Sequence, residues 1–341
     1  MRPALLISTM LAAMTIAAPA TAKPDAMSCA AATRYSDAHR GVAVHVLDHG
    51  KIVCDTAQGG HTAPHELWSG TKSFVGIMAA AAVQDGLLTL DEPASATLIE
   101  WQGDPQKSRI TIRQILSMTS GQPSVIGKPP TYRDSLDGAL VADPGTRFLY
   151  GPTPMQSFGE ILKRKLKAAG QSDNVLAYLA RRVLDPIGLR YADWRKGIDG
   201  NPLLPQGAIL TAAEWAKFGE FIRAGGTVAG KPIVDPASFA AMFKSGAVNP
   251  AYGLTWWLPH VGKAADPITA GTDIGRRAAE LPADIVLAAG AGDQRLYVIP
   301  SLGLTIVRMA DLDIAALMNP PKDPAKRWSD VDFLKLLKAT D

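Results

Sequence analysis

A serine and a lysine three residues apart, Ser69 and Lys72, are the pair in this chain best suited to covalent chemistry. They lie where a loop leads into a long apolar run that predicts a helix. The i, i+3 spacing places both side chains on one face of that helix. Burial and the positive end of the helix lower the pKa of a lysine from its usual value of about 10.4. The pair is therefore predicted to be a nucleophile and its base.

Other catalytic signatures are missing from the sequence. No Gly-x-Ser-x-Gly elbow surrounds Ser69, so the local residues do not predict an α/β-hydrolase. Five of the six histidines lie between positions 39 and 65, and no later Asp/His cluster completes a ligand set. We therefore expect no metal and no cofactor. On the local residues alone, a helix-capping serine beside an unrelated lysine remains an alternative for Ser69 and Lys72.

The composition is that of an ordinary globular protein, with 47% hydrophobic and 20% charged residues among 341. A formal net charge of +3 is too small to indicate nucleic-acid binding. A basic cluster at 163–167 lies on an amphipathic pattern and is interpreted as a solvated helix face. The Ser69–Lys72 pair and the small net charge favour a small molecule as the partner over a nucleic acid, and the oligomeric state stays open.

The first 22 residues are predicted to be a signal peptide, because Arg2 precedes an apolar run that ends in the small-x-small pattern of residues 20–22. The apolar run is too short for a stable membrane span. We expect cleavage near Ala22 and a periplasmic or secreted protein. In that oxidising compartment Cys29 and Cys54 are a plausible disulfide, with a lipid-modified Cys29 as the weaker alternative.

The pattern of elements predicts an α/β fold of the α+β type. Helices are expected near 29–39, 69–86, 111–118, 155–168, 174–184, 211–224, 236–243 and 325–338, and strands at 41–47, 51–54, 252–258, 285–288, 296–299 and 304–309. Strands at both ends of the chain predict one antiparallel sheet flanked by helices. The mature domain, 23–341, then divides into a sheet part (29–66 and 245–341) and an inserted, mainly helical part (67–244). Ligand sites favour the cleft at such a junction.

Ordered motifs along the chain resemble the serine β-lactamase and penicillin-binding-protein superfamily, in particular its class C-like branch with carboxylesterases and 6-aminohexanoate-dimer hydrolases. The matching segments are WSGTKSF (68–74), LLTLDEP (87–93), TIRQILSMTSG (111–121), PGTRFLY (144–150), LDPIGL (184–189), QGAILTAAEWAKFG (206–219) and GAGDQRLYVIP (290–300). They follow the family order over most of the chain. The resemblance removes the helix-cap alternative and supports Ser69 and Lys72 as the reacting pair.

The resemblance also implies a third catalytic residue. Tyr150 occupies the place of the tyrosine in the family's Tyr-x-Asn motif and would act as a general base or proton shuttle. Pro152 stands where the family has asparagine, and Gln156 or Ser157, about one helical turn later, are candidates to replace it.

The family's Lys-Thr-Gly motif falls on residues 288–290, Ala-Ala-Gly, so its cation and hydroxyl are absent here. The resemblance implies an oxyanion hole made by the backbone N–H groups of Ser69 and Ala291, with Gly290 at the substrate. Trp256, with Trp257 beside it, is a weaker candidate for the wall of an acyl pocket, and core packing is the alternative role.

The expected function is an exported serine hydrolase that cleaves an ester or amide through an acyl-enzyme on Ser69. Loss of the cationic third motif disfavours β-lactams and D-alanyl-D-alanine peptides, which remain the first alternative. A non-catalytic exported binding protein with a degenerate hydrolase cleft is an alternative of another class.

Overall fold

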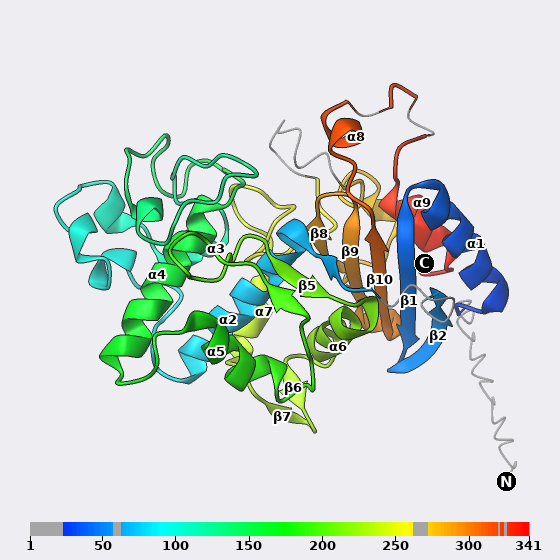
Figure 1. Cartoon of the computed structure of the whole chain (residues 1–341), viewed down its shortest axis with the longest axis horizontal. Coiled ribbons are helices and arrows are strands. Elements are labelled where there is room, and N and C mark those ends of the chain that lie inside the picture. Colours follow the sequence, from blue (N-terminus) through cyan, green and yellow to red (C-terminus); the bar gives the residue numbers. More distant parts are fainter. Residues whose placement is uncertain (1–22, 57–62, 262–271, 320, 324–325, 341) are drawn as a thin grey trace, which may run out of the picture.

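The computed structural model describes residues 23–56, 63–261, 272–319, 321–323 and 326–340 (Figure 1). The predicted signal peptide, residues 1–22, lies outside the described residues. Within the described ranges, no helix is both long enough and apolar enough to cross a membrane.

A five-stranded antiparallel sheet joins the two ends of the chain. Its strand order is β2-β1-β10-β9-β8. The bounds are β1 (Gly41–Asp48), β2 (Lys51–Asp55), β8 (Val286–Gly290), β9 (Gln294–Ile299) and β10 (Leu304–Ala310). The first and last of these in the sequence pair directly, with Val44 opposite Arg308. This sheet, with the helices around it, confirms the predicted fold class.

Helices cover both faces of the sheet. α1 (Ala26–Ala38) lies along β1 and packs against α9 (Asp330–Leu336), whereas α6 (Ala212–Arg223) packs on β1, β9 and β10. On β10, Arg308 donates to Ser36 of α1 and Thr305 donates to Glu220 of α6. Because side chains of a strand alternate between faces, these two contacts place α1 and α6 on opposite sides. α6 therefore packs on the sheet although it lies within the stretch predicted as the helical insertion.

A disulfide between Cys29 and Cys54 fastens α1 to β2, as the sequence predicted for an oxidising compartment. The two Cα atoms are 5.5 Å apart, which is a usual separation for a disulfide.

The rest of the described chain forms the mainly helical part on the far side of β8 (Figure 1). Its helices are α2 (Ser73–Gln84), α3 (Ile112–Leu116), α4 (Thr153–Ala168), α5 (Val175–Leu179), which runs into a π-helical turn (Ala180–Leu184), and α7 (Pro236–Met242). Small strands are β3 (His65–Glu66), β4 (Asp193–Trp194), β5 (Ala208–Leu210), β6 (Thr227–Val228) and β7 (Lys231–Pro232), and α8 (Ile314–Met318) follows β10. α2 is buried over residues 73–82, as expected for a helix that is apolar on all sides.

Two predicted elements differ from the structure. The helix predicted from Ser69 begins as a 3-10 turn, Trp68–Lys72, and becomes α-helical only at Ser73. The strand predicted at 252–258 is wrong, because only isolated bridges form there, between Tyr252 and Trp257 and between Trp257 and Leu287. Thr255 has φ of 70°, which interrupts the extended backbone that a strand requires.

Candidate active site

Ser69 lies in a tightly held turn between the sheet and the helical part. Leu67, just before it, is fully buried and donates its N–H to the carbonyl of Ala208 in β5. The N–H of Ala208 in turn donates to the Thr71 hydroxyl. Trp68 has φ of 48°, a conformation that costs a non-glycine residue about 1–2 kcal/mol. The surrounding hydrogen bonds hold this strained turn, which leaves Ser69 half-buried at the head of α2.

Lys72 is buried and points back at Ser69. Its Nζ lies 2.8 Å from the Ser69 Oγ and 2.9 Å from the carbonyl oxygen of Pro205. Burial lowers the pKa of Lys72 from 10.5 to about 7. No ion pair joins Lys72 to an acid among the described residues, so no carboxylate there stabilises its charged form. Near neutral pH a large share of the molecules therefore contains a neutral amine in contact with the serine hydroxyl.

Tyr150 lies on the other side of the same pair. Lys72 Nζ is 4.7 Å from the centre of the Tyr150 ring. Burial raises the pKa of Tyr150 to about 12, outweighing the opposite effects of its hydrogen bond with Ser69 and of the Arg295 charge. The ring packs against Tyr252 and Trp257, with centroids 5.9 and 5.4 Å away. Tyr150 is thus a neutral phenol at neutral pH, able to pass a proton but not poised as a tyrosinate base.

The end of β8 packs directly against the segment before Ser69. A Cβ added at Gly290 would come within 2.0 Å of the Leu67 carbonyl oxygen, so only glycine permits this approach. Residues 291–293 then form the turn into β9. Ala291, the predicted second oxyanion donor, is the first residue of that turn.

Arg295, to which the sequence analysis gave no role, supports this peptide. Its Nη1 donates to the Gly290 carbonyl at 3.1 Å, which belongs to the same peptide unit as the Ala291 N–H. The buried guanidinium is also paired with Asp330 at 2.7 Å and with Asp293 at 3.0 Å. A charged donor on the carbonyl fixes the orientation of that peptide and strengthens the N–H on its other side. The GAGDQR segment contained the residue, but only the fold shows its target.

Neither candidate for the missing asparagine contacts Lys72. The Gln156 amide bridges Pro130 and Leu204, and the Ser157 hydroxyl bonds with Gln122 and Ser135. Pro152 is the N-cap residue of α4 and offers no polar side chain. Apart from Ser69, the acceptor of the Lys72 amine is the carbonyl of Pro205, a backbone group that has no side-chain signature in a sequence.

The two adjacent tryptophans have different surroundings. Trp256 is fully buried and packs against Phe218 and Phe243, at centroid distances of 6.1 and 5.5 Å. This arrangement favours the core role and not the acyl pocket for Trp256. Trp257, in contrast, packs on Tyr150.

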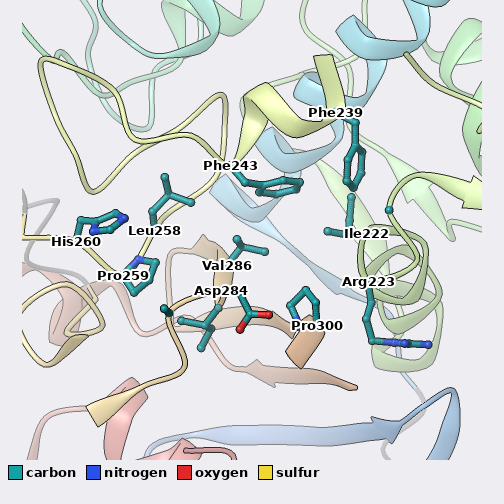
Figure 2. A pocket seen from close by; sticks show the side chains of 13 residues that line it. Ile222, Arg223, Phe239, Phe243, Leu258, Pro259, His260, Asp284, Val286 and Pro300 are labelled. Carbon is teal, nitrogen blue, oxygen red and sulfur yellow. The ribbon is translucent and has the colours of Figure 1, made fainter. Parts of the chain in front are cut away.

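A separate apolar pocket of about 390 Å³ lies near the other end of β8 (Figure 2). Figure 2 shows Phe239, Phe243, Leu258 and Val286 around it. Because β8 runs from Val286 at this pocket to Gly290 beside the Ser69 turn, the pocket and the nucleophile lie at opposite ends of one strand.

The fold, a five-stranded antiparallel sheet with helices on both faces beside a mainly helical part, defines the class as β-lactamase-like proteins. The sequence profile of the β-lactamase family matches residues 27–319. The chain belongs to this family, and the membership supports serine hydrolase activity in general. The resemblance seen in the sequence motifs is confirmed.

Solved structures from several branches of the superfamily share the fold. A class C β-lactamase from Rhodobacter sphaeroides has 17% identity and a TM-score of 0.62, covering 91% of this chain and 98% of its own. EstCE1, a hydrolase with promiscuous acyltransferase activity, has 16% identity and a TM-score of 0.62, with coverages of 92% and 96%. A candidate 6-aminohexanoate-dimer hydrolase from Bacillus anthracis has 18% identity and a TM-score of 0.63, with coverages of 82% and 75%. Likeness at these identities concerns the fold alone.

Proposed function

We propose that the protein is an exported serine hydrolase that cleaves an ester or a non-peptidoglycan amide through an acyl-enzyme on Ser69. The observation that carries the proposal is the contact between Ser69 and a buried lysine. Lys72 Nζ is 2.8 Å from the hydroxyl, and its pKa is lowered to about 7. A lysine with an ordinary pKa would be almost entirely protonated at neutral pH and could not accept the serine proton.

In the first step the Ser69 Oγ attacks the carbonyl carbon of the substrate. Its proton passes to the neutral amine of Lys72, and the carbonyl oxygen becomes an oxyanion. The N–H groups of Ser69 and Ala291 are the proposed donors to that oxyanion. Loss of one such donor typically costs about 2.7–4 kcal/mol of transition-state stabilisation.

Collapse of the tetrahedral intermediate breaks the bond to the leaving group. The leaving oxygen or nitrogen takes a proton from Tyr150, and the resulting tyrosinate takes the proton that the nearby Lys72 ammonium received from Ser69. A pKa of about 12 suits Tyr150 to this relay, because the phenol remains protonated until a basic leaving group forms. Water then attacks the acyl carbon and gives a proton to the neutral Lys72 amine. The bond from the acyl carbon to Ser69 Oγ breaks, Lys72 returns that proton to the serine oxygen, and the acid is released.

The substrate preference follows from the end of β8. Residues 288–290 are Ala-Ala-Gly, and Ala288 is buried, so this segment provides no side chain that could hold a substrate carboxylate. β-Lactams and D-alanyl peptides carry such a carboxylate. We therefore propose esters or neutral amides as substrates in preference to those compounds.

The test combines substrate turnover with labelling of the nucleophile. The wild-type protein, Ser69→Ala and the control Ser73→Ala are incubated with p-nitrophenyl esters, a chromogenic cephalosporin and a fluorophosphonate probe. Ser73 lies one turn further along, and its hydroxyl donates to the Gly70 carbonyl at 2.7 Å. We expect wild type and Ser73→Ala to cleave esters and to carry the probe on the peptide containing residue 69, and Ser69→Ala to do neither.

Three outcomes would contradict parts of the proposal. Equal turnover by wild type and Ser69→Ala would refute the nucleophile. Cephalosporin turnover faster than ester turnover would replace the substrate class by β-lactams. A folded wild-type protein that neither labels nor cleaves any of these compounds would favour a non-catalytic binding protein.

A further inference from the structure

The Pro205 carbonyl that accepts from Lys72 belongs to a segment without regular secondary structure, residues 202–207, which we name the acceptor loop. A carbonyl can orient an amine only if its own peptide is held in place. The loop begins at Pro202, which forms an isolated bridge with Lys196, and leads into β5, which starts at Ala208. The position of the Lys72 acceptor therefore depends on what fixes this loop.

Four side chains from different segments of the chain hydrogen-bond to it or to its end. Hydrogen bonds to the loop and its end are Tyr132 Oη to the Pro202 carbonyl (3.1 Å), Trp194 Nε1 to the Leu203 carbonyl (3.1 Å), the Leu204 N–H to Gln156 Oε1 (3.2 Å) and the Ala208 N–H to Thr71 Oγ1 (3.2 Å). Of these four, the Gln156 contact is the one made at the residue directly before Pro205.

Gln156 is well placed to act as a fixed support. It lies on α4 and is fully buried. Its Nε2 donates to the Pro130 carbonyl at 2.7 Å while its Oε1 accepts from Leu204. Because one partner is a carbonyl and the other an N–H, only one orientation of the amide satisfies both, so the side chain has a single bonded arrangement.

We propose that Gln156 is a positioning residue for Lys72: by holding the Leu204 N–H, it fixes the Pro205 carbonyl that orients the Lys72 amine toward Ser69. This inference rests on the proposed function of the Ser69–Lys72 pair. Gln156 touches neither reacting group and acts through the acceptor loop.

The chemistry of a neutral amine explains why this position matters. Such an amine has two N–H bonds and one lone pair, and only the lone pair can take the serine proton. When the Pro205 carbonyl accepts one N–H, the lone pair has fewer directions available and can be directed at the Ser69 hydroxyl. Pro152 offers no side-chain acceptor for the same amine, so in this chain the orientation depends on the acceptor loop.

The carbonyl also affects the protonation of Lys72. A hydrogen bond accepted from an ammonium is stronger than one accepted from a neutral amine, so the Pro205 carbonyl favours the charged form. Releasing the carbonyl is then expected to lower the pKa of Lys72 further. The acid limb of the pH profile would move toward lower pH, while the pH-independent rate would fall because the lone pair is less well oriented.

The test compares Gln156→Met with Ser157→Ala. Methionine retains most of the glutamine volume but makes neither hydrogen bond. Ser157 is the next residue of α4, is equally buried, and bonds with Ser135 and Gln122, which are not part of the acceptor loop. Both proteins are first checked for folding by circular dichroism and thermal unfolding, and kcat, KM and the pH profile of kcat/KM are then measured with a p-nitrophenyl ester.

We expect Gln156→Met to lose roughly 10- to 100-fold in kcat at the pH optimum, with KM within about twofold of wild type. Its acid limb should shift to lower pH by on the order of one unit. Ser157→Ala should keep both the rate and the profile.

A folded Gln156→Met whose kcat and acid limb match those of Ser157→Ala would overturn the inference and leave the proposed function intact. If wild type itself shows no ester turnover and no labelling of Ser69, the proposed function fails instead, and the two failures are thereby distinguished. A Gln156→Met that does not fold is replaced by Gln156→Glu, which keeps an oxygen for the Leu204 N–H. That variant should retain the wild-type acid limb, and a displaced limb would count against the inference.

Discussion

Replacing Lys72 with methionine is expected to stabilise the folded protein while abolishing its activity. Lys72 is 3% exposed, and burial lowers its pKa from 10.5 to about 7. In the unfolded chain the same lysine stays protonated up to about pH 10.4. Folding therefore has to remove a proton from the Lys72 ammonium or bury the charged ammonium, and either process makes folding less favourable. A methionine side chain has a similar length and carries no charge, so its burial has no such cost.

The size of the effect follows from the difference between the two pKa values. One unit corresponds to about 1.36 kcal/mol, so the lysine destabilises the folded state by about 5 kcal/mol well below pH 7 and by about 4.4 kcal/mol at pH 7, where half of the folded molecules are already neutral at this residue. Between pH 7 and 10.5 the unfolded state binds more protons than the folded state, so wild-type stability rises with pH. At pH 9.5 the remaining cost is about 1.4 kcal/mol. The gap between the two proteins should therefore narrow by about 3 kcal/mol from pH 7 to pH 9.5.

Urea unfolding of wild type, Lys72→Met and the exposed-site control Lys128→Met at pH 7 and pH 9.5 measures this gap, and ester turnover is followed in parallel. We expect Lys72→Met to have a higher urea midpoint at pH 7, little advantage at pH 9.5, and no turnover. Lys128→Met should match wild type at both pH values. A Lys72→Met advantage that does not change with pH, or a wild-type acid limb of kcat/KM far above pH 7, would refute the buried neutral lysine.

Three other substitutions test features of the fold around the site. Gly290→Ala should lower the unfolding free energy by about 1–3 kcal/mol and slow labelling of Ser69, because the added Cβ would lie 2.0 Å from the Leu67 carbonyl oxygen. Gly103→Ala is the control and should do neither, because a Cβ added there has no other residue's atom within 4 Å beyond its chain neighbours. Equal effects of the two substitutions would contradict the close approach at Gly290. Thr255→Gly should raise the unfolding free energy by about 1 kcal/mol, measured by thermal unfolding, because Thr255 has φ of 70° and a buried hydroxyl without a partner in the described structure. Thr255→Ala removes the hydroxyl but keeps the Cβ, so equal stability of the two variants would refute backbone strain as the cause. The double variant Cys29→Ser, Cys54→Ser should lose about 3 kcal/mol, given a separation of 25 residues, and an unchanged urea midpoint would show that the bond adds no stability.

Features with a local cause were predictable from the sequence. The Ser69–Lys72 contact follows from an i, i+3 spacing at the start of an apolar helix, and the structure brings the two side chains to 2.8 Å. All five strands of the main sheet were predicted with ends within two residues of the observed ones, because β-rich runs between turn residues identify them. The largest differences are at the end of β8, which extends to Gly290, and at the start of β9, which begins at Gln294.

Features that depend on distant backbone groups were not predictable. Pro205 contributes a carbonyl, which every residue has, so no residue type indicated its role. Gln156 was one of two candidates to replace the family's asparagine, whereas in the fold it hydrogen-bonds to the acceptor loop and not to Lys72. The apolar run at 252–258 has the composition of a strand, but the positive φ of Thr255 is set by tertiary packing. Likewise, the raised pKa of Tyr150 depends on its burial, to which aromatic rings about a hundred residues further along the chain contribute.

The pairing of β1 with β10 has a consequence for the order in which the site is assembled during folding. The central ladder joins the first described strand, β1, to the last, β10, so many contacts join residues that are far apart in the sequence. Ser69, Lys72 and Tyr150 are all synthesised before β8, whose end carries Gly290 and Ala291. A nascent chain on the ribosome thus contains the nucleophile long before it contains the strand that completes the site. The proposed oxyanion donor at Ala291 can therefore reach Ser69 only after the C-terminal strands have joined the sheet, so a chain that ends before β8 is expected to lack the complete site.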